Sequence, residues 1–338
     1  MKTIATAIVL LAIPVYASAQ PAAPNPRVAR VVQASTMYGV PSADLNSFKA
    51  DVVFLGVPYD LGHASLPGAR LGPAAIREAS SIAGPAGADG FYDRETGGTF
   101  MKGVRLVDAG DVITPTANVT QSLANVTSAI ATIVKGGAMP VTIGGDHSIT
   151  FAVLRGFEGA GRKIHIIHFD SHQDFGPIND RLTGQPVIQH GNHLHHAVDL
   201  PWIGGLSMIG LRGLAHGAGA TASEVRASNV TMISASEALK LGPAAVAARI
   251  PAAEAYYVTI DIDVLDPSIA PATGTPVPGG FSYYQLCDQL AALAAKGRIV
   301  GFDITEVSPP YDRNNETSLL ASYVGLRFLG SIFEHRAK

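Results

Sequence analysis

Short apolar runs alternate along the chain with longer segments whose apolar residues follow helical spacing. Such runs, bounded by glycine, proline or acidic residues, are typical of strands buried in a parallel sheet. The predicted strands are residues 52–57, 104–107, 139–143, 164–169, 206–211, 230–233, 256–262 and 299–304.

Three of the intervening segments have clear helical features. Residues 119–133 place apolar side chains on one stripe, residues 284–295 lie between Ser282 as N-cap and Gly297 as stop, and residues 316–333 form the last helix. Alternating strands and helices predict a mainly parallel sheet covered on both faces. The pattern fits both an open sheet and an eight-stranded barrel, and in both folds ligands bind at the carboxyl ends of the strands.

The composition indicates one globular domain with a small-molecule site. No linker or charge run divides the 338 residues after the N-terminal segment, so we expect a single domain over residues 20–338. Hydrophobic residues make up 47% and charged residues 15%, which suits a large core and a subunit interface. The net charge is −3 and the sequence has no basic cluster, so it lacks the clustered positive charge that is typical of nucleic-acid-binding proteins.

The N-terminal residues have the pattern of a secretory signal. Lys2 precedes an apolar stretch over residues 4–15, and small residues follow at 17–19. We predict a Sec-type signal peptide over residues 1–19 with cleavage before Gln20, and a secreted or periplasmic protein without a membrane anchor. The stretch is short for a membrane span, and an uncleaved interfacial anchor is the alternative.

Acidic residues and histidines follow three of the predicted strands. They are Asp170, His172 and Asp174 after one strand, Asp261 and Asp263 at the end of another, and His147 after a third. If the first of these strands stays extended beyond residue 169, its alternating side chains point to one face. Because the carboxyl ends of parallel strands share one edge, the six side chains are expected to meet there.

Four aspartates and two neutral histidines carry about four negative charges, which two divalent cations would balance. Carboxylate and imidazole ligands without thiolate suit manganese, with zinc, iron or cobalt as alternatives and nickel less favoured. The sequence therefore predicts a binuclear site with two Mn²⁺ ions per subunit. The alternative is a set of ordinary strand-end turns rich in Asp and Gly.

The order of several motifs makes the chain similar to the ureohydrolase family, the arginase and agmatinase group of metal-dependent amidinohydrolases. The matching segments are residues 56–60, 67–77, 108–111, 144–148, 169–174, 190–192, 261–267, 273–276 and 301–307. The resemblance implies an arginase-like α/β fold, three-layer α/β/α with an eight-stranded mostly parallel sheet, in a homotrimer or homohexamer. It also implies a hydrolase that releases urea from a small guanidino substrate.

The resemblance assigns roles to individual residues. One Mn²⁺ would be bound by His147, Asp170, Asp174 and Asp261, and the other by His172, Asp170, Asp261 and Asp263, with Asp146 behind them. A metal-bridging hydroxide would attack the guanidine carbon. Asp174, His190 and Glu306 would then be catalytic, with His190 as the proton shuttle and Glu306 as the carboxylate that binds the guanidinium group.

Other roles remain open for these residues. From spacing alone, any histidine within residues 190–196 could be the shuttle, and Glu306 could instead pair with Arg313. Arg70 and Arg77 are expected to be structural.

The match is weakest where it concerns the substrate. Residues 67–77 and 307–312 look like the agmatinase branch, but residues 175–178 lack the asparagine of arginases and Val277 stands where agmatinases commonly have glutamate. The substrate is either agmatine, giving putrescine, or a guanidino acid such as guanidinobutyrate or guanidinopropionate. The candidate substrate-binding residues are Glu306, Asn192, His193 and Arg181.

Two other functions also fit the sequence. A formiminoglutamase-type C–N hydrolase would use the same metals with a different pocket. A non-catalytic exported protein could bind a metal or a guanidino ligand without turnover.

Overall fold

The computed structural model describes residues 28–29, 35–63, 66–84, 89–180, 182–214 and 230–336. The predicted signal peptide and Arg181 lie outside these residues, so the signal peptide and the domain limits stay predictions. Within the described part of the chain, no helix is both long and apolar enough to cross a membrane.

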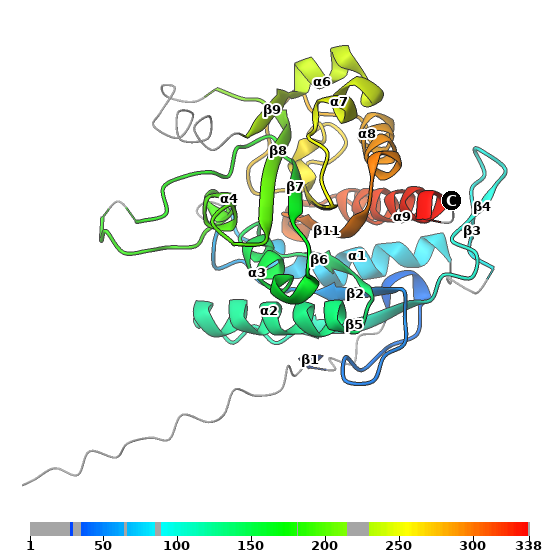
Figure 1. The fold of residues 1–338 in the computed structure, drawn as a ribbon, viewed down its shortest axis with the longest axis horizontal. Coiled ribbons are helices and arrows are strands. Elements are labelled where there is room, and N and C mark those ends of the chain that lie inside the picture. Colours follow the sequence, from blue (N-terminus) through cyan, green and yellow to red (C-terminus); the bar gives the residue numbers. More distant parts are fainter. Residues whose placement is uncertain are drawn as a thin grey trace, which may run out of the picture.

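One large sheet runs through the molecule in the strand order β1-β5-β2-β6-β11-β10-β7-β8-β9 (Figure 1). The strands are β1 (Val28–Ala29), β2 (Val52–Gly56), β5 (Leu106–Val112), β6 (Met139–Ile143), β7 (Ile164–Phe169), β8 (Ile203–Leu211), β9 (Thr231–Ser234), β10 (Ala255–Asp261) and β11 (Ile299–Thr305). All eight predicted strands are present and pair in parallel, while the short β1 adds an antiparallel edge. The sheet is open, so the eight-stranded mostly parallel sheet is confirmed. A small hairpin of β3 (Phe91–Tyr92) and β4 (Thr99–Phe100) lies outside it.

Polar side chains cap two of the long helices, and the Ser282 cap was predicted from the sequence. In α2 (Val119–Lys135), the Asn118 side chain accepts the N–H of Gln121. In α8 (Tyr283–Lys296), Ser282 forms a capping box with Gln285. The remaining helices are α1 (Gly72–Ser80), α3 (Ile149–Arg155), α4 (His193–Ala197), α6 (Ala235–Leu241), α7 (Pro243–Arg249) and α9 (Glu316–Arg336).

Two hydrophobic cores lie on opposite faces of the sheet. Successive strand side chains point to opposite faces, so Phe54 of β2 joins one core whereas Val53 and Leu55 join the other. The first core also contains side chains of α1, α7, α8 and α9, and the second contains side chains of α2, α3 and α4. Figure 1 shows α2 and α3 on one side of the strands and α8 and α9 on the other. The three-layer arrangement is therefore confirmed.

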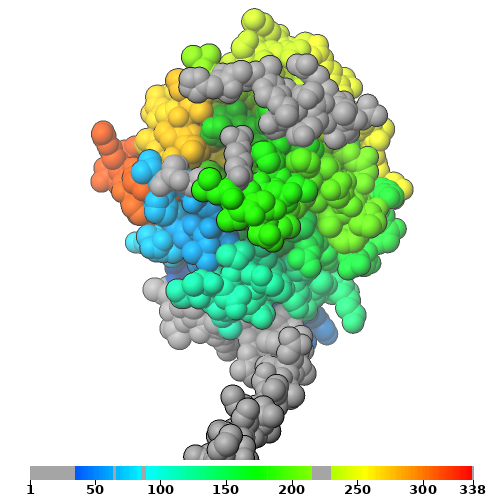
Figure 2. Space-filling view, turned by 90° about the vertical axis from the view of Figure 1, so that its left-hand side faces the viewer, coloured from blue at the N-terminus to red at the C-terminus, as the bar shows by residue number. Residues whose placement is uncertain are grey.

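The predicted metal-binding residues follow β6, β7 and β10, and Glu306 follows β11. These four strands are neighbours in the centre of the sheet. Because they are parallel, their carboxyl ends meet at one edge. Figure 2 shows a face where cyan, green and yellow segments from distant parts of the sequence come together.

A buried arginine joins the helix after β2 to strand β5. The Arg77 guanidinium donates to both oxygens of Asp108 at 2.7 and 3.0 Å and pairs with Asp111. Gly56 makes room for this contact, because a Cβ there would lie 1.9 Å from an Asp111 oxygen. Arg70, by contrast, is half exposed and pairs with Asp60 at 2.9 Å.

We expect Arg77→Met to lower the free energy of unfolding by about 3–5 kcal/mol, because it leaves two aspartates without their buried counter-charge. Urea denaturation measures this loss. The matched control is Arg105→Met, whose exposed pair with Asp51 should contribute little. Equal losses in the two variants would contradict a special role for the Arg77 pair.

Candidate metal centre and active site

The turn after β6 fixes His147 at the carboxyl edge. Gly145 is required there, since a Cβ would lie 1.7 Å from the carbonyl oxygen of Tyr59. The buried Asp146 carboxylate accepts the N–H groups of Gly62 and Ser148 at 2.8 and 3.0 Å. Burial and the nearby Glu306 raise the pKa of Asp146 to about 7. Asp146 thus holds the turn, and His147 projects from it.

The turn after β7 differs from the expected extended strand. β7 ends at Phe169, so the condition under which alternating residues would share one strand face is not met. Instead, Asp170 accepts the N–H of His172 at 2.5 Å, and Asp174 has a left-handed φ of 48°. Such a conformation is strained for a residue with a Cβ and tends to occur at functional sites. The turn, rather than the strand, brings Asp170, His172 and Asp174 together.

The end of β10 contributes the remaining carboxylates. Asp261 accepts the N–H of Asp263, which lies in the short 3₁₀ helix Ile262–Val264, at 2.8 Å. Asp263 in turn accepts the N–H of Ser171 at 3.0 Å. These backbone contacts fix the two acids against the turn after β7.

One group of donors surrounds the Nδ1 atom of His147. Oxygens of Asp170, Asp174 and Asp261 lie 3.1, 3.3 and 3.2 Å from it. A Zn-sized ion binds nitrogen and oxygen at about 2.1 Å, so adjacent ligands of one ion lie roughly 3.0 to 3.4 Å apart. The three distances from His147 Nδ1 therefore match those between adjacent ligands of one divalent ion, and donor atoms of His147, Asp170 and Asp261 all lie within 4.8 Å of one another.

The tautomer of His147 strengthens this conclusion. The Thr259 hydroxyl donates to Asp303 at 2.6 Å, so it accepts the N–H of His147 Nε2 at 2.7 Å. Burial alone would lower the pKa of His147, but Asp170, Asp174 and Asp261 outweigh burial and raise this pKa well above its ordinary value. Three carboxylates around Nδ1 thus favour a positive charge there, and because Nε2 contacts Thr259, Nδ1 is the atom that would bind a metal ion. Thr259 and Asp303 were not singled out by the sequence analysis.

A second group shares Asp170 with the first. The Nδ1 atom of His172 lies 3.4 Å from Asp170 Oδ1 and 3.0 Å from Asp263 Oδ2. Asp170 faces His147 through Oδ2, so its two oxygens reach both groups. Buried Asp263 Oδ2 has no hydrogen-bond partner among the described residues. All six predicted metal-binding residues thus gather in two adjoining groups.

Burial and mutual repulsion disturb the charges of these acids. Burial and the neighbouring Asp263 and Asp170 raise the pKa of Asp261 well above its ordinary value. Burial and Asp170 raise the pKa of Asp263 to about 6. Divalent ions would offset these effects by stabilising the ionised forms.

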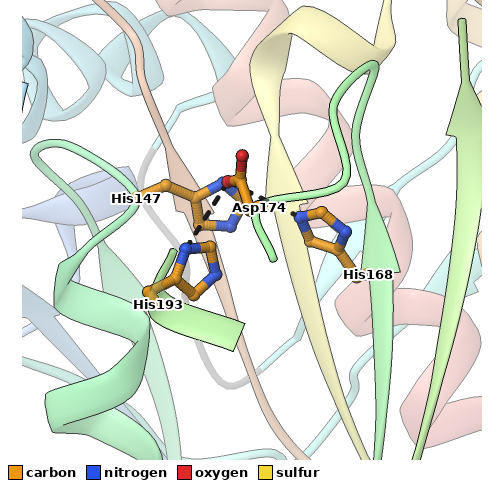
Figure 3. A group of neighbouring side chains, drawn as sticks. All are labelled: His147, His168, Asp174 and His193. Atoms are coloured by element: carbon orange, nitrogen blue, oxygen red, sulfur yellow. Dashed lines mark ion pairs between the residues drawn. The ribbon is translucent and has the colours of Figure 1, made fainter. Parts of the chain in front are cut away.

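Two further histidines lie beside the first group. Figure 3 shows His147, His168 and His193 around Asp174. His168 Nε2 is 2.9 Å from Asp170 Oδ2, and the His193 ring stacks on His147 with centroids 4.3 Å apart. His168 was missed, although its position two residues before Asp170 on β7 placed it on the same face.

A cavity of about 340 Å³ opens beside the metal-binding groups. Its described lining residues are His172, Gln173, Asp174, Phe175, Gly176, His190, Gly191, Asp261 and Thr275. His190 therefore lies where a substrate would bind. His195 and His196 instead contact the backbone carbonyls of Gly176 and Val187 at 2.8 and 2.9 Å.

Glu306 is fully buried behind His190 and has a left-handed φ of 64°. Its Oε1 atom accepts the backbone N–H of His147 at 2.7 Å and lies 3.6 Å from His190 Nδ1. Its Oε2 atom lies 3.3 Å from His63 Nε2. Its partners are thus histidines and not Arg313. His63 carried no signal in the sequence, because it lies in a loop far from the predicted strand ends.

Asn192 and His193 do not line the cavity in this structure. The Asn192 amide donates to the carbonyls of Pro177 and Val187, and its oxygen accepts the N–H of Gln189. His193 is fully buried and contacts the carbonyl of His190 at 2.8 Å. This geometry gives both residues a role in holding the loop and offers no support for their predicted contact with substrate.

Comparisons with known proteins agree with this arrangement. A sequence model of the arginase family matches residues 50–330. The chain is 36% identical over 287 residues to proclavaminate amidinohydrolase of Streptomyces clavuligerus, covering 82% of this chain and 87% of that protein. It is 32% identical over 281 residues to guanidinobutyrase of Pseudomonas aeruginosa, covering 80% and 83%. The solved structure of the Streptomyces enzyme superposes with a TM-score of 0.78 at 32% identity, covering 90% of this chain and 98% of that one.

The chain belongs to the arginase family. The prediction of an agmatinase-like ureohydrolase, an enzyme that hydrolyses C–N bonds, is confirmed at the level of this family.

We expect Thr259→Val to weaken metal binding about tenfold, because the variant keeps the shape of the side chain but no longer accepts the His147 N–H. Competition with a chromogenic chelator measures the affinity. Thr127→Val, which removes an α2 hydroxyl bonded to the backbone carbonyls of Leu123 and Ala152, is the control. Unchanged affinity in Thr259→Val would show that this hydroxyl does not set the tautomer.

Proposed function

We propose that the protein hydrolyses a guanidino acid to urea and a primary amine, using two divalent ions. The observation that best supports this is the position of His147 Nδ1, which lies within 3.3 Å of an oxygen of each of three buried carboxylates beside the cavity. Manganese is the first expectation for both ions, with the ligands named above. When bound, such ions lower the pKa of water and supply a nucleophile at neutral pH.

The reaction consumes one water. Its oxygen bonds to the guanidine carbon, the bond from that carbon to the substituted nitrogen breaks, and both protons of the water end on that nitrogen. The amine thus leaves as an ammonium group that carries the positive charge of the guanidinium, and urea is neutral. The protein must therefore bind a cation, deliver water and move two protons to the leaving nitrogen.

We assign to His190 the transfer of a proton to the departing amine. Burial alone would lower its pKa, but the Glu306 carboxylate outweighs burial and raises it. The raised pKa favours the protonated form of His190, which can donate its proton to the departing amine. Glu306 stabilises the cationic form of His190, and its charge also attracts the guanidinium group.

The cavity favours a guanidino acid over agmatine. Its described lining residues contain no acid apart from Asp174 and Asp261, which belong to the metal-binding groups, so no separate carboxylate would hold the ammonium of agmatine. Partly exposed Gln173 lines the cavity outside these groups and offers an amide donor for a carboxylate. Relatives named guanidinobutyrase, guanidinopropionase and agmatinase are 32%, 31% and 32% identical to this chain, so the choice of a guanidino acid rests on the cavity.

We also propose, from the sequence pattern, that residues 1–19 are removed and that the protein acts outside the cytoplasm as a homotrimer or homohexamer. The N-terminal mass of the mature protein and its light-scattering mass test these two points. An intact Met1 in the cytoplasm would contradict export.

The substrate prediction concerns urea release by the manganese-loaded protein. We expect guanidinobutyrate or guanidinopropionate to give a kcat/KM at least tenfold above that of agmatine, arginine or free guanidine, a difference of about 1.4 kcal/mol. Asp174→Asn, which keeps the side-chain shape but removes a metal-binding charge, should abolish urea release.

The other outcomes are equally informative. Preferred turnover of agmatine would contradict the guanidino-acid assignment. Bound metal without urea from any substrate would favour formiminoglutamate hydrolysis or a binding role.

A second prediction concerns pH. If His190 must be protonated, kcat falls as pH rises through its pKa, and Glu306→Gln should move this fall to lower pH because it removes the charge that raises the pKa. A kcat–pH profile of wild type and variant measures the shift. If kcat falls at the same pH in wild type and in Glu306→Gln, His190 is not the acid that limits the rate.

A further inference from the structure

A separate group of donors lies behind the cavity. His63 Nε2 is 3.3 Å from one oxygen of Glu306, and His190 Nδ1 is 3.6 Å from the other. The two imidazole rings stack with centroids 4.4 Å apart. One donor atom from each of the three side chains lies within 4.8 Å of the other two. Residues from three distant parts of the chain thus converge on one point.

The two oxygens of the Glu306 carboxylate differ in their hydrogen bonds. Oε1 accepts the N–H of His147 at 2.7 Å, whereas the buried Oε2 has no hydrogen-bond partner among the described residues. A buried carboxylate oxygen that faces an imidazole nitrogen at 3.3 Å is costly unless a positive charge lies beside it. The left-handed backbone of Glu306 holds the side chain in this position. A cation between Glu306 and the two histidines would offset the cost.

We propose that His63, His190 and Glu306 form a third metal site, distinct from the two aspartate-rich groups, which binds Zn²⁺ and thereby inhibits the enzyme. Two imidazoles and one carboxylate are a ligand set that zinc takes in sites with an open coordination position. The 3.3 Å between His63 Nε2 and Glu306 Oε2 matches adjacent ligands of one ion with bonds of about 2.1 Å.

Inhibition follows from the role of His190. An imidazole nitrogen that ligates zinc cannot carry a proton to the leaving amine. The ion can reach the site through the cavity, because His190 is among the residues that line it. The inhibitory effect rests on the proposed function, whereas zinc binding itself does not.

Gly274 provides a second way to test the site. A Cβ at this position would lie 2.2 Å from Nε2 and 2.5 Å from Cε1 of the His63 ring. The glycine therefore makes room for the ring beside Glu306. Gly274→Ala should displace the ring without removing any of the three ligands.

The first test uses the intact protein. Crystals loaded with Mn²⁺ are soaked in Zn²⁺, and anomalous scattering on both sides of the zinc edge locates the added ion. We expect a zinc peak between His63, His190 and Glu306, and one additional equivalent of zinc in calorimetry. Neither readout requires turnover, so both decide the site even if no substrate is found.

The second test compares variants. His63→Asn and Gly274→Ala should weaken the additional zinc equivalent about tenfold or more and should relieve zinc inhibition relative to each variant's own activity. His335→Asn, an exposed histidine on α9, is the control for surface binding. Circular dichroism and the content of the first two ions confirm that each variant is folded.

Two results would overturn the proposal. One is the absence of a zinc peak at these three side chains in the wild-type crystal. The other is additional zinc that binds equally well to wild type, His63→Asn and Gly274→Ala.

Discussion

The central constraint on this protein is the neutralisation of four aspartates at one edge of the sheet. Asp170, Asp174, Asp261 and Asp263 are each at most 9% exposed, and like charges in a poorly solvated site repel strongly. Rigid parallel strands and the hydrogen bonds of the strand-end turns prevent the acids from moving apart. Protons on the acids and on His147 can balance part of this charge, and the proposed ions would balance the rest.

The sequence predicted the parts of the structure that follow from local patterns. Buried parallel strands appear as continuous apolar runs, so all eight were found. Acids and histidines after such runs must share one edge of the sheet, so residues such as His147 and Asp261 could be identified before any geometry was known. The choice between an open sheet and a barrel needed the family resemblance, because both have the same order of elements.

The remaining features depend on contacts between distant residues. His63 meets Glu306 only because two loops pack together, and Thr259 reaches His147 only across neighbouring strands. Asn192 and His193 were expected at the substrate because of their position near His190, but their side chains bond to backbone within the loop. The left-handed backbone of Asp174 also has no signature in its residue type.

The wide separation of the donor residues has a consequence for the life of the protein in the cell. His147 and Asp261 are 114 positions apart, so an unfolded chain cannot reproduce their arrangement. The proposed ions would therefore bind the folded state and lower the fraction of molecules that are transiently unfolded. Proteases that cleave opened chains would then degrade the protein faster when metal is scarce. The abundance of the enzyme would follow the metal supply without any dedicated regulator.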